Sequence, residues 1–338
     1  MTVRILVAGD HFVRNSLLID SLRAEVAEDL EFRALELAWP LEPFGRVAEV
    51  DEACGSEEQM IEALQGVRVC VTQMAPLTER VLAASEDLEL VAVGRGGPVN
   101  VNVAAARRHG VAVTCAPGRN AVATAEHTVA LLLAAARRIP LTHGELQRGI
   151  WRGDYYQYDQ VGPELDGATV GLIGYGAIGR RVARILRGFG ARILVHDPYA
   201  SVEPDCEAAP LQELLRRSQM VSLHARATPE TTGMIGAEQL ALLPAGAILV
   251  NCARGALLDY DAACDALESG HLFALAADVF DTEPLPSQSR LLGAPGVVTT
   301  PHLAGASKQT AHNAARIAAA EVARFLRGEP LAHQVGAR

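Results

Sequence analysis

The sequence predicts an α/β protein with two domains, each built on a parallel β-sheet. The chain has 338 residues, which exceeds the size at which a single hydrophobic core keeps growing. Short apolar segments alternate almost throughout with segments rich in Ala, Leu and Glu, as expected for strands joined by helices. A glycine-rich turn at residues 174–179 lies near the start of a second such series, where a strand should pass directly into a helix.

The first series of strands occupies the N-terminal third of the chain. Because helices separate these strands, they should pair in parallel. The domain is expected to be flavodoxin-like. A long apolar helix, Ala121–Arg138, follows and is interpreted as the bridge between the domains. The strands are expected at Arg4–Ala8, Glu31–Leu37, Val67–Val71, Leu88–Val93 and Val111–Thr114.

The second series of strands begins at Val170. The helix expected at Lys308–Leu326 would carry the chain back to the first domain. The predicted boundaries therefore assign residues 1–102 and 309–338 to one domain and residues 103–308 to the other. The later strands are expected near Ile193 and at Met220–Leu223, Ile248–Val250, Phe273–Ala276 and Val297–Val298.

The segment VGLIGYGAIG has the spacing of a dinucleotide-binding turn. Gly174 would permit the turn, Gly176 would leave room for a phosphate, and Gly179 would let the helix pack on the sheet. Asp197 ends the next strand, where a carboxylate can accept hydrogen bonds from ribose hydroxyls and would repel a 2′-phosphate. A Rossmann-like domain that prefers NAD to NADP is predicted, with an ordinary glycine turn as the alternative.

Composition excludes several other classes of function. The net charge of −10 argues against a nucleic-acid or anionic-membrane partner, because such binding needs a basic face. The six cysteines are scattered without metal-ligand spacing, so no metal site is expected and a reducing cytoplasm is predicted. The apolar run Ile5–Ala8 is too short for an export signal, and charged residues bracket the most apolar helix, so no membrane span is expected.

Three side chains that could carry chemistry follow strands of the second domain. Residues just past the carboxyl ends of parallel strands face a ligand crevice, which would bring Arg254, Glu283 and His302 together. A histidine can exchange a proton with a hydroxyl near neutral pH, and a carboxylate behind it fixes its tautomer and favours its charged form. A guanidinium can bind a substrate carboxylate. The set fits hydride transfer from a 2-hydroxy acid or, in the reverse direction, to its 2-oxo acid.

The first domain is expected to contribute backbone amides to the same substrate. One carboxylate could be met by Arg254 and these amides, whereas a phosphate would need a second positively charged fork. Arg119 is the one nearby candidate for that fork, and it is interpreted as a solvated linker charge instead. The predicted substrate-binding residues are Gln73, Met74, Arg95, Gly96 and Arg254.

A series of motifs resembles the D-isomer-specific 2-hydroxyacid dehydrogenases. They run over nearly the whole chain: VGRGG, TAEHTVALLLA, GYGAIGRRVA, HDPY, NCARG, DVFDTEP and PHLAG. The resemblance implies an enzyme that interconverts a small D-2-hydroxy acid and its 2-oxo acid with NAD. It further implies that Arg254 binds substrate, Glu283 pairs with the base and His302 is the acid/base. The first domain would then be the substrate domain.

The resemblance also implies cofactor contacts and an assembly. The long helix of the NAD-binding domain would build a homodimer, and the apolar stretch Thr128–Ala136 and the aromatic segment IWRGDYYQY favour such an interface. Trp151 is expected at the partner's active-site mouth. The residues expected near NAD are Gly174, Gly176, Ala177, Ile178, Gly179, Asp197, Cys252, Ala253, Arg254, Asp278, His302 and Gly305.

The chain departs from the family pattern at three places. Pro98–Asn102 stands where the family usually reads GxGxDN, which predicts altered contacts to nicotinamide and substrate. Thr72 and Gln73 stand where phosphoglycerate dehydrogenases have arginine and serine, which argues against a phosphorylated substrate. Arg226 replaces a common proline and could add an anion contact for NADP. Two alternatives stay open, namely a different hydride donor such as phosphite and a non-catalytic NAD-sensing regulator.

Overall fold

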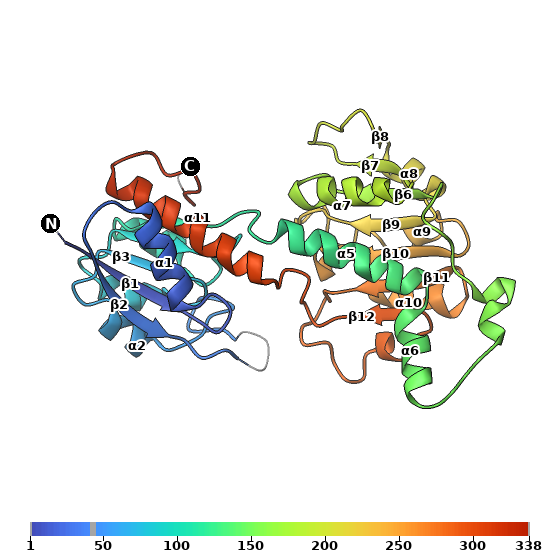
Figure 1. The fold of residues 1–338 in the computed structure, drawn as a ribbon, viewed down its shortest axis with the longest axis horizontal. Coiled ribbons are helices and arrows are strands. Elements are labelled where there is room, and N and C mark those ends of the chain that lie inside the picture. The colour runs from blue at the N-terminus through green and yellow to red at the C-terminus, as the bar shows by residue number, and fades with distance from the viewer. Residues whose placement is uncertain (1, 41–44, 337–338) are drawn as a thin grey trace. The chain divides into compact units, whose positions relative to one another are not determined.

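The computed structural model describes residues 2–40 and 45–336, and it divides into two compact units. Unit 1 comprises Met1–Asn120 and Ala306–Arg338, and unit 2 comprises Ala121–Gly305. Each unit has one parallel sheet with helices packed against it (Figure 1). The predicted fold class is therefore confirmed.

Unit 1 contains a five-stranded parallel sheet with the order β2-β1-β3-β4-β5. This is the strand order of flavodoxin-like domains, the class expected for this part of the chain. Val7 of the central strand pairs with Ala34 on one side and with Val71 on the other. The strands are β1 (Val3–Gly9), β2 (Leu30–Glu36), β3 (Val69–Thr72), β4 (Leu90–Val93) and β5 (Ala112–Thr114).

Helices cover both faces of this sheet, and each face forms its own core because successive strand residues point to opposite sides. Val7 and Val71 pack with α1 and α11, which lie side by side in Figure 1. Leu6 and Cys70 pack on the other face with α2, α3 and α4. The helices are α1 (Asn15–Glu25), α2 (Glu57–Ala63), α3 (Glu79–Ala83), α4 (Val103–Arg108) and α11 (Lys308–Leu326).

Unit 2 contains a seven-stranded parallel sheet with the order β12-β11-β10-β9-β6-β7-β8. Strand β6 is flanked by β7 and β9, so the strand order reverses beside it, and such a switch point is where open α/β sheets bind ligands. The strands are β6 (Thr169–Ile173), β7 (Arg192–His196), β8 (Glu207–Ala208), β9 (Met220–Leu223), β10 (Ala247–Asn251), β11 (Leu272–Ala277) and β12 (Val297–Thr299).

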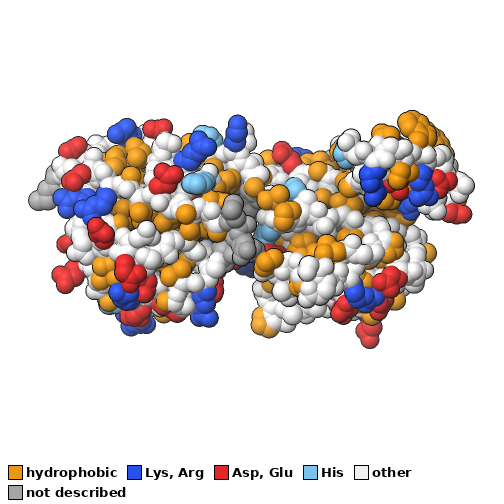
Figure 2. Space-filling model, turned by 90° about the horizontal axis from the view of Figure 1, so that it is seen from below, with side chains coloured by type: hydrophobic (Ala, Val, Ile, Leu, Met, Phe, Trp, Pro, Cys, Tyr) orange, Lys and Arg blue, Asp and Glu red, His pale blue; other side chains and the backbone are white. Residues whose placement is uncertain are grey.

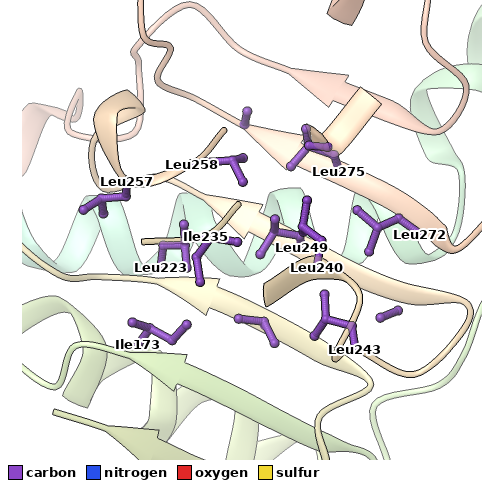
Figure 3. Close-up of a cluster of buried hydrophobic side chains, with 14 of the residues drawn as sticks. Ile173, Leu223, Ile235, Leu240, Leu243, Leu249, Leu257, Leu258, Leu272 and Leu275 are labelled. Carbon is purple, nitrogen blue, oxygen red and sulfur yellow. The ribbon is translucent and has the colours of Figure 1, made fainter. Parts of the chain in front are cut away.

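Two cores sandwich this sheet. On one face Ile173, Leu223, Leu249 and Leu275 project from four strands and pack with α8, α9 and α10 (Figure 3). On the other face the strands pack with α5 and α7. The α-helices are α5 (Ala121–Ala136), α6 (Ile139–Gln147), α7 (Ala177–Gly188), α8 (Leu211–Arg217), α9 (Ala237–Leu240) and α10 (Tyr260–Glu268). The 3-10 helices are η1 (Asp154–Tyr156), η2 (Tyr158–Gln160), η3 (Gly255–Leu257) and η4 (Arg290–Leu292).

The boundaries between the units differ from those expected at 102/103 and 308/309. Residues 103–120 stay with unit 1 because β5 pairs with β4, with Ala112 opposite Leu90. Gln334 also forms an antiparallel bridge with Thr114 of this edge strand. At the second boundary the Ser307 side chain caps α11, so the change of unit falls before that residue.

The helix α5, interpreted as the bridge between the domains, is the first element of unit 2. Its apolar residues, including Leu131, Leu132 and Ala135, are buried in unit 2, where α5 packs against α7, β10 and β11.

Within the described ranges, no helix is long and apolar enough to span a membrane. The same residues contain no group of three or more His, Cys, Asp or Glu side chains placed to hold a metal.

Candidate active site

The glycine turn joins β6 to the N-terminus of α7. Gly174 has φ +98°, and a Cβ there would lie 2.6 Å from the Ala225 nitrogen. A Cβ on Gly179 would lie 2.3 Å from the Gly174 oxygen, so both positions require glycine for the chain's own packing. Gly176 is different, because a Cβ there would meet no described atom within 4 Å. The space in front of this helix N-terminus is therefore open, as a bound pyrophosphate requires.

Asp197 follows β7 and faces the glycine turn. Its Oδ2 accepts the Tyr175 amide at 2.7 Å, and its Oδ1 accepts the amides of Tyr199 and Ala200 at 2.9 and 3.1 Å. Burial opposes ionisation of this carboxyl, but the three amides outweigh it and lower its pKa. Asp197 is thus a charged acceptor that fixes the turn, with about one lone-pair site left for a ribose hydroxyl.

Arg254 is exposed on the loop between β10 and η3. Gly255, the residue after Arg254, packs closely against the loop that follows β11. A Cβ at this position would lie 1.9 Å from the Phe280 oxygen, so only glycine allows the two loops to approach this closely. The Asn251 side chain donates to the Arg254 carbonyl at 2.9 Å and to the Tyr260 hydroxyl at 3.1 Å. The close approach of Gly255 to Phe280 brings the Arg254 loop beside the segment that carries Glu283.

Glu283 and His302 form the central pair of the site. Glu283 Oε2 lies 2.7 Å from His302 Nδ1, while its Oε1 accepts the Phe280 amide at 2.9 Å. The hydrogen bond to Glu283 raises the pKa of His302 despite burial, which acts in the opposite direction. Burial opposes ionisation of Glu283, but hydrogen bonds from His302 and Phe280 lower its pKa below the usual value. The structure therefore brings the two predicted partners together.

The imidazole remains accessible from solvent, and its backbone is held in an uncommon conformation. The His302 side chain is 54% exposed, so the ring nitrogen that does not face Glu283 can meet a ligand. His302 has φ +52°, in the left-handed region that residues other than glycine seldom adopt. Such strain persists only where surrounding contacts impose it.

Asp278 supplies those contacts, a role that sequence reasoning missed. Its fully buried carboxylate accepts the amides of Leu303 and Ala304, both at 2.8 Å, and the Thr300 hydroxyl at 2.5 Å. His127 of α5 supports Thr300 through an Nε2 to Oγ1 contact of 2.9 Å. Through these hydrogen bonds, Asp278 holds the loop in place on both sides of His302.

The remaining predicted cofactor residues lie near these loops of unit 2. Ala177 opens α7, and Ile178 follows it. Cys252 and Ala253 are buried between β10 and Arg254, and burial raises the pKa of the Cys252 thiol to about 12, which makes it unreactive at neutral pH. Gly305 is the last residue of unit 2.

The predicted substrate residues of unit 1 form hydrogen bonds and an ion pair within their own unit that the sequence did not predict. The amides of Met74 and Ala75 donate to Thr72 Oγ1 at 3.3 and 3.0 Å. In this conformation, neither amide is free to donate to a substrate carboxylate. The Arg95 guanidinium forms an ion pair with Glu52. Gly96 is exposed beside it.

The divergent loop at Pro98–Asn102 has structural contacts of its own. Asn100 is fully buried and donates through Nδ2 to the Ala75 carbonyl at 2.8 Å. Asn102 caps α4 by accepting the Ala105 amide at 2.9 Å. The two asparagines thus fasten the loop to the substrate-side segment after β3 and to the following helix.

Sequence comparison identifies the family. Residues 129–304 match the profile described as "D-isomer specific 2-hydroxyacid dehydrogenase, NAD binding domain". This match covers more than half of the chain and nearly all of unit 2. The chain belongs to the D-isomer-specific 2-hydroxyacid dehydrogenase family. The resemblance noted from the motifs is confirmed, and unit 2 is the NAD-binding domain of this dehydrogenase family.

Relatives in the family carry different names. A glyoxylate reductase of Korarchaeum cryptofilum is 37% identical over 82% of this chain and 86% of its own length. A D-3-phosphoglycerate dehydrogenase of Methanocaldococcus jannaschii is 36% identical over 84% of this chain but 54% of its own length. The chain thus spans about half the length of several phosphoglycerate dehydrogenases that it matches.

Solved structures agree with this assignment. A crystal structure of a Thermus thermophilus protein superimposes with a TM-score of 0.80 at 31% identity, covering 98% of this chain and 100% of that one. That protein therefore shares the fold of this chain over nearly its whole length.

Proposed function

We propose that the protein is an NAD-dependent dehydrogenase that interconverts a small D-2-hydroxy acid and its 2-oxo acid. The observation that carries this proposal is the 2.7 Å hydrogen bond between Glu283 and His302 beside the Arg254 loop. It supplies an acid/base with a charge partner and a guanidinium for a carboxylate on adjoining loops.

The glycine turn and Asp197 are the groups that would hold NAD. The open space at Gly176 fits a pyrophosphate at the N-terminus of α7, and Asp197 offers an acceptor to a ribose hydroxyl. The bound cofactor supplies or accepts the hydride. The further contacts expected at Ala177, Ile178, Cys252, Ala253, Asp278 and Gly305 belong to the same proposal.

The protein side chains would move the proton and hold the substrate. In the direction of reduction, the His302 imidazolium donates a proton to the substrate carbonyl oxygen as the carbonyl carbon gains hydride. Glu283 stabilises the imidazolium, as the raised pKa of His302 indicates. Arg254 binds the substrate carboxylate and polarises the carbonyl group. Oxidation uses the same groups in reverse, with neutral His302 as the base.

The substrate is proposed to be a small 2-oxo acid without a phosphate, such as glyoxylate or hydroxypyruvate. Thr72 and Gln73 provide no second positive charge after β3, and the Arg95 charge is paired with Glu52. Gln73, Met74, Arg95 and Gly96 remain the proposed substrate loops of unit 1.

A homodimer formed through unit 2 is also proposed. Trp151, Tyr156 and Tyr158 are 85%, 95% and 90% exposed, so these rings do not pack on their own unit. Exposed apolar residues of α6 and its end, Ile139, Leu141, Leu146 and Ile150, lie close to them in sequence. On the face drawn in Figure 2, hydrophobic side chains reach the surface beside acidic and basic ones. Such exposed rings favour an interface between copies.

A panel of 2-oxo acids scored by NADH consumption tests the proposed function. Turnover of at least one small 2-oxo acid is expected, and His302→Ala should lower it roughly a hundredfold to ten-thousandfold, the range for loss of a general acid. His312→Ala, at an exposed histidine of α11, is the matched control. Oxidation of phosphite alone, or NAD binding without turnover of any candidate, would replace the proposal with one of the two alternatives.

A further inference from the structure

Four polar side chains of unit 1 follow four neighbouring strands of its sheet. Asp10 follows β1, Gln73 follows β3, Arg95 follows β4 and Arg119 follows β5. The carboxyl ends of parallel strands meet at one edge of a sheet, which is the edge where α/β domains bind ligands. Two of the proposed substrate residues, Gln73 and Arg95, therefore share this edge with Arg119.

Arg119 is not the solvated linker charge that the sequence suggested. Its Nη1 is buried and has no hydrogen-bond partner among the described residues. Its Cζ lies 6.0 Å from the centroid of the Phe12 ring, and its carbonyl accepts the Asn313 side chain at 3.2 Å. Burial is the main cause that lowers the pKa of Arg119 to about 10, with the charge of Arg95 acting in the same direction. The guanidinium is therefore still charged at neutral pH.

The acidic groups nearby are already engaged. Asp10 Oδ1 accepts the amides of Phe12 and Val13, and its Oδ2 accepts the Gln73 side chain at 3.2 Å. Glu52 is paired with Arg95. Arg119 forms no ion pair with any residue in the described ranges, although the charge of Asp10 does act on it. The buried Nη1 of this partly exposed guanidinium therefore lacks a hydrogen-bond acceptor, and leaving a charged donor unpaired is costly.

The Gln73 side chain has an unpaired acceptor, whereas Arg119 has an unpaired donor. Gln73 is 4% exposed, and its Oε1 has no partner among the described residues. The amide orientation is fixed by Asp10, because exchanging the two amide atoms would set an oxygen against a carboxylate. The edge therefore offers a buried donor on Arg119 and a buried acceptor on Gln73, both next to Asp10.

We propose that Arg119 binds a second carboxylate of the substrate and so selects 2-oxo acids that carry two acidic groups. This inference rests on the proposed function, since it takes the segments after β3 and β4 as substrate loops. It narrows the proposed substrate, because it favours dicarboxylic 2-oxo acids over glyoxylate and hydroxypyruvate. A carboxylate fits better than a phosphate, because Asp10 would oppose a dianion and Arg95 is already neutralised by Glu52. A hydroxyl or a water beside the carboxylate could donate to Gln73 Oε1.

Substrates matched in carbon number test the assignment by turnover. Oxaloacetate is compared with 2-oxobutyrate, and 2-oxoglutarate with 2-oxovalerate. In the wild type the dicarboxylate of each pair should have the higher kcat/KM. Arg119→Ala should lower that preference roughly tenfold to a hundredfold, as expected for losing hydrogen bonds to a charged group, mainly through KM. Arg119→Lys should restore part of it, since the charge returns without the planar fork.

Arg107→Ala is the control for loss of charge. Arg107 lies exposed in α4 of the same unit, and its removal should leave the preference unchanged. Equal efficiencies within each pair in the wild type would overturn the inference. So would an Arg119→Ala variant that loses both members of a pair equally, which is the result expected if Arg119 only fastens the segment between β5 and α5. A preference for a phosphorylated 2-oxo acid would overturn the choice of carboxylate.

A binding measurement separates this inference from the proposed function. Calorimetric titration compares succinate with butyrate on the wild type, Arg119→Ala and Arg107→Ala, and it needs no turnover. Tighter binding of succinate that is lost only in Arg119→Ala supports the site even if no 2-oxo acid is reduced. Equal binding of both acids by the wild type would remove the site even if 2-oxo acids are reduced.

Discussion

The hydrogen bond between Glu283 and His302 governs the pH range in which the imidazole can donate a proton. Because this bond raises the pKa of His302, reduction of a 2-oxo acid should persist to higher pH than an isolated histidine would allow. Glu283→Gln removes the charge and should move the basic limb of kcat/KM for reduction to lower pH. The limb for oxidation, which needs neutral His302, should move in the same direction.

The measurement is a pH profile of kcat/KM in both directions for the two proteins. Glutamine keeps an acceptor for the Phe280 amide, so the loop should keep its shape. A profile that stays in place while the rate falls would mean that Glu283 acts on packing alone.

Asp197 governs the choice of cofactor through its charge. Asp197→Asn can keep an acceptor for the amides of Tyr199 and Ala200, although it loses the acceptor for the Tyr175 amide, and it removes the charge that opposes a 2′-phosphate. It therefore disturbs the turn less than alanine would. The NAD preference over NADP should narrow by about tenfold or more, the size of one lost charged hydrogen bond. Comparing kcat/KM for NADH and NADPH measures this. A wild type that used both cofactors equally would contradict the prediction and direct attention to Arg226.

Sequence reasoning found the side chains whose chemistry is distinctive but not the structural roles that depend on distant partners. His302, Glu283 and Arg254 follow strands and carry reactive groups, which made them visible. Asp278 acts by accepting from residues more than twenty positions away, and a strand-terminal acid gives no sign of that. The engagement of Arg95 with Glu52 depends equally on tertiary structure.

At the level of elements, the loops after β10 and β11 are held together by a glycine. A Cβ at position 255 would overlap the Phe280 carbonyl, so Gly255→Ala must separate the Arg254 loop from the segment that leads to Glu283. We expect a loss of at least about 1–3 kcal/mol in the free energy of unfolding, the usual cost of overpacking. The rise in KM should exceed what the lost stability explains, because Arg254 is displaced.

Chemical denaturation and steady-state kinetics on the same samples test this expectation. Gly188→Ala in α7 is the control, since a Cβ there meets nothing within 4 Å. That substitution should be neutral or stabilising by about 0.5–1 kcal/mol, as for glycine to alanine in a helix. A Gly255→Ala protein as stable and active as the wild type would show that the two loops adjust freely.

The order and type of the elements were predictable, but one boundary was not. The periodicity of apolar residues located every strand of both sheets except the two-residue β8. The predicted boundary at 102/103 separated residues 111–114 from the first series of strands to which their apolar pattern had assigned them, and β5 does pair with β4 of unit 1.

For the whole molecule, we expect a homodimer in solution at micromolar concentration. The exposed rings of Trp151, Tyr156 and Tyr158 would otherwise remain in water. Light scattering coupled to gel filtration gives the mass directly. Replacing Trp151 and Tyr156 with serine should shift the population toward monomers, whereas the same change at Tyr199, exposed elsewhere on unit 2, should not. A wild type that runs as a monomer contradicts the proposed assembly.

The return of α11 to unit 1 has a consequence for biosynthesis. All of unit 2 is translated before Ala314, Ala315 and Val322, which pack against α1 and the sheet of unit 1. In a nascent chain, unit 2 can therefore fold while unit 1 still lacks α11. One apolar face of the unit 1 sheet, which includes Val7 and Val71, is then exposed to water and chaperones. Ribosome-bound chains stalled past residue 305 should yield a protease-resistant unit 2 and a protease-sensitive unit 1, and equal resistance of both would contradict this order.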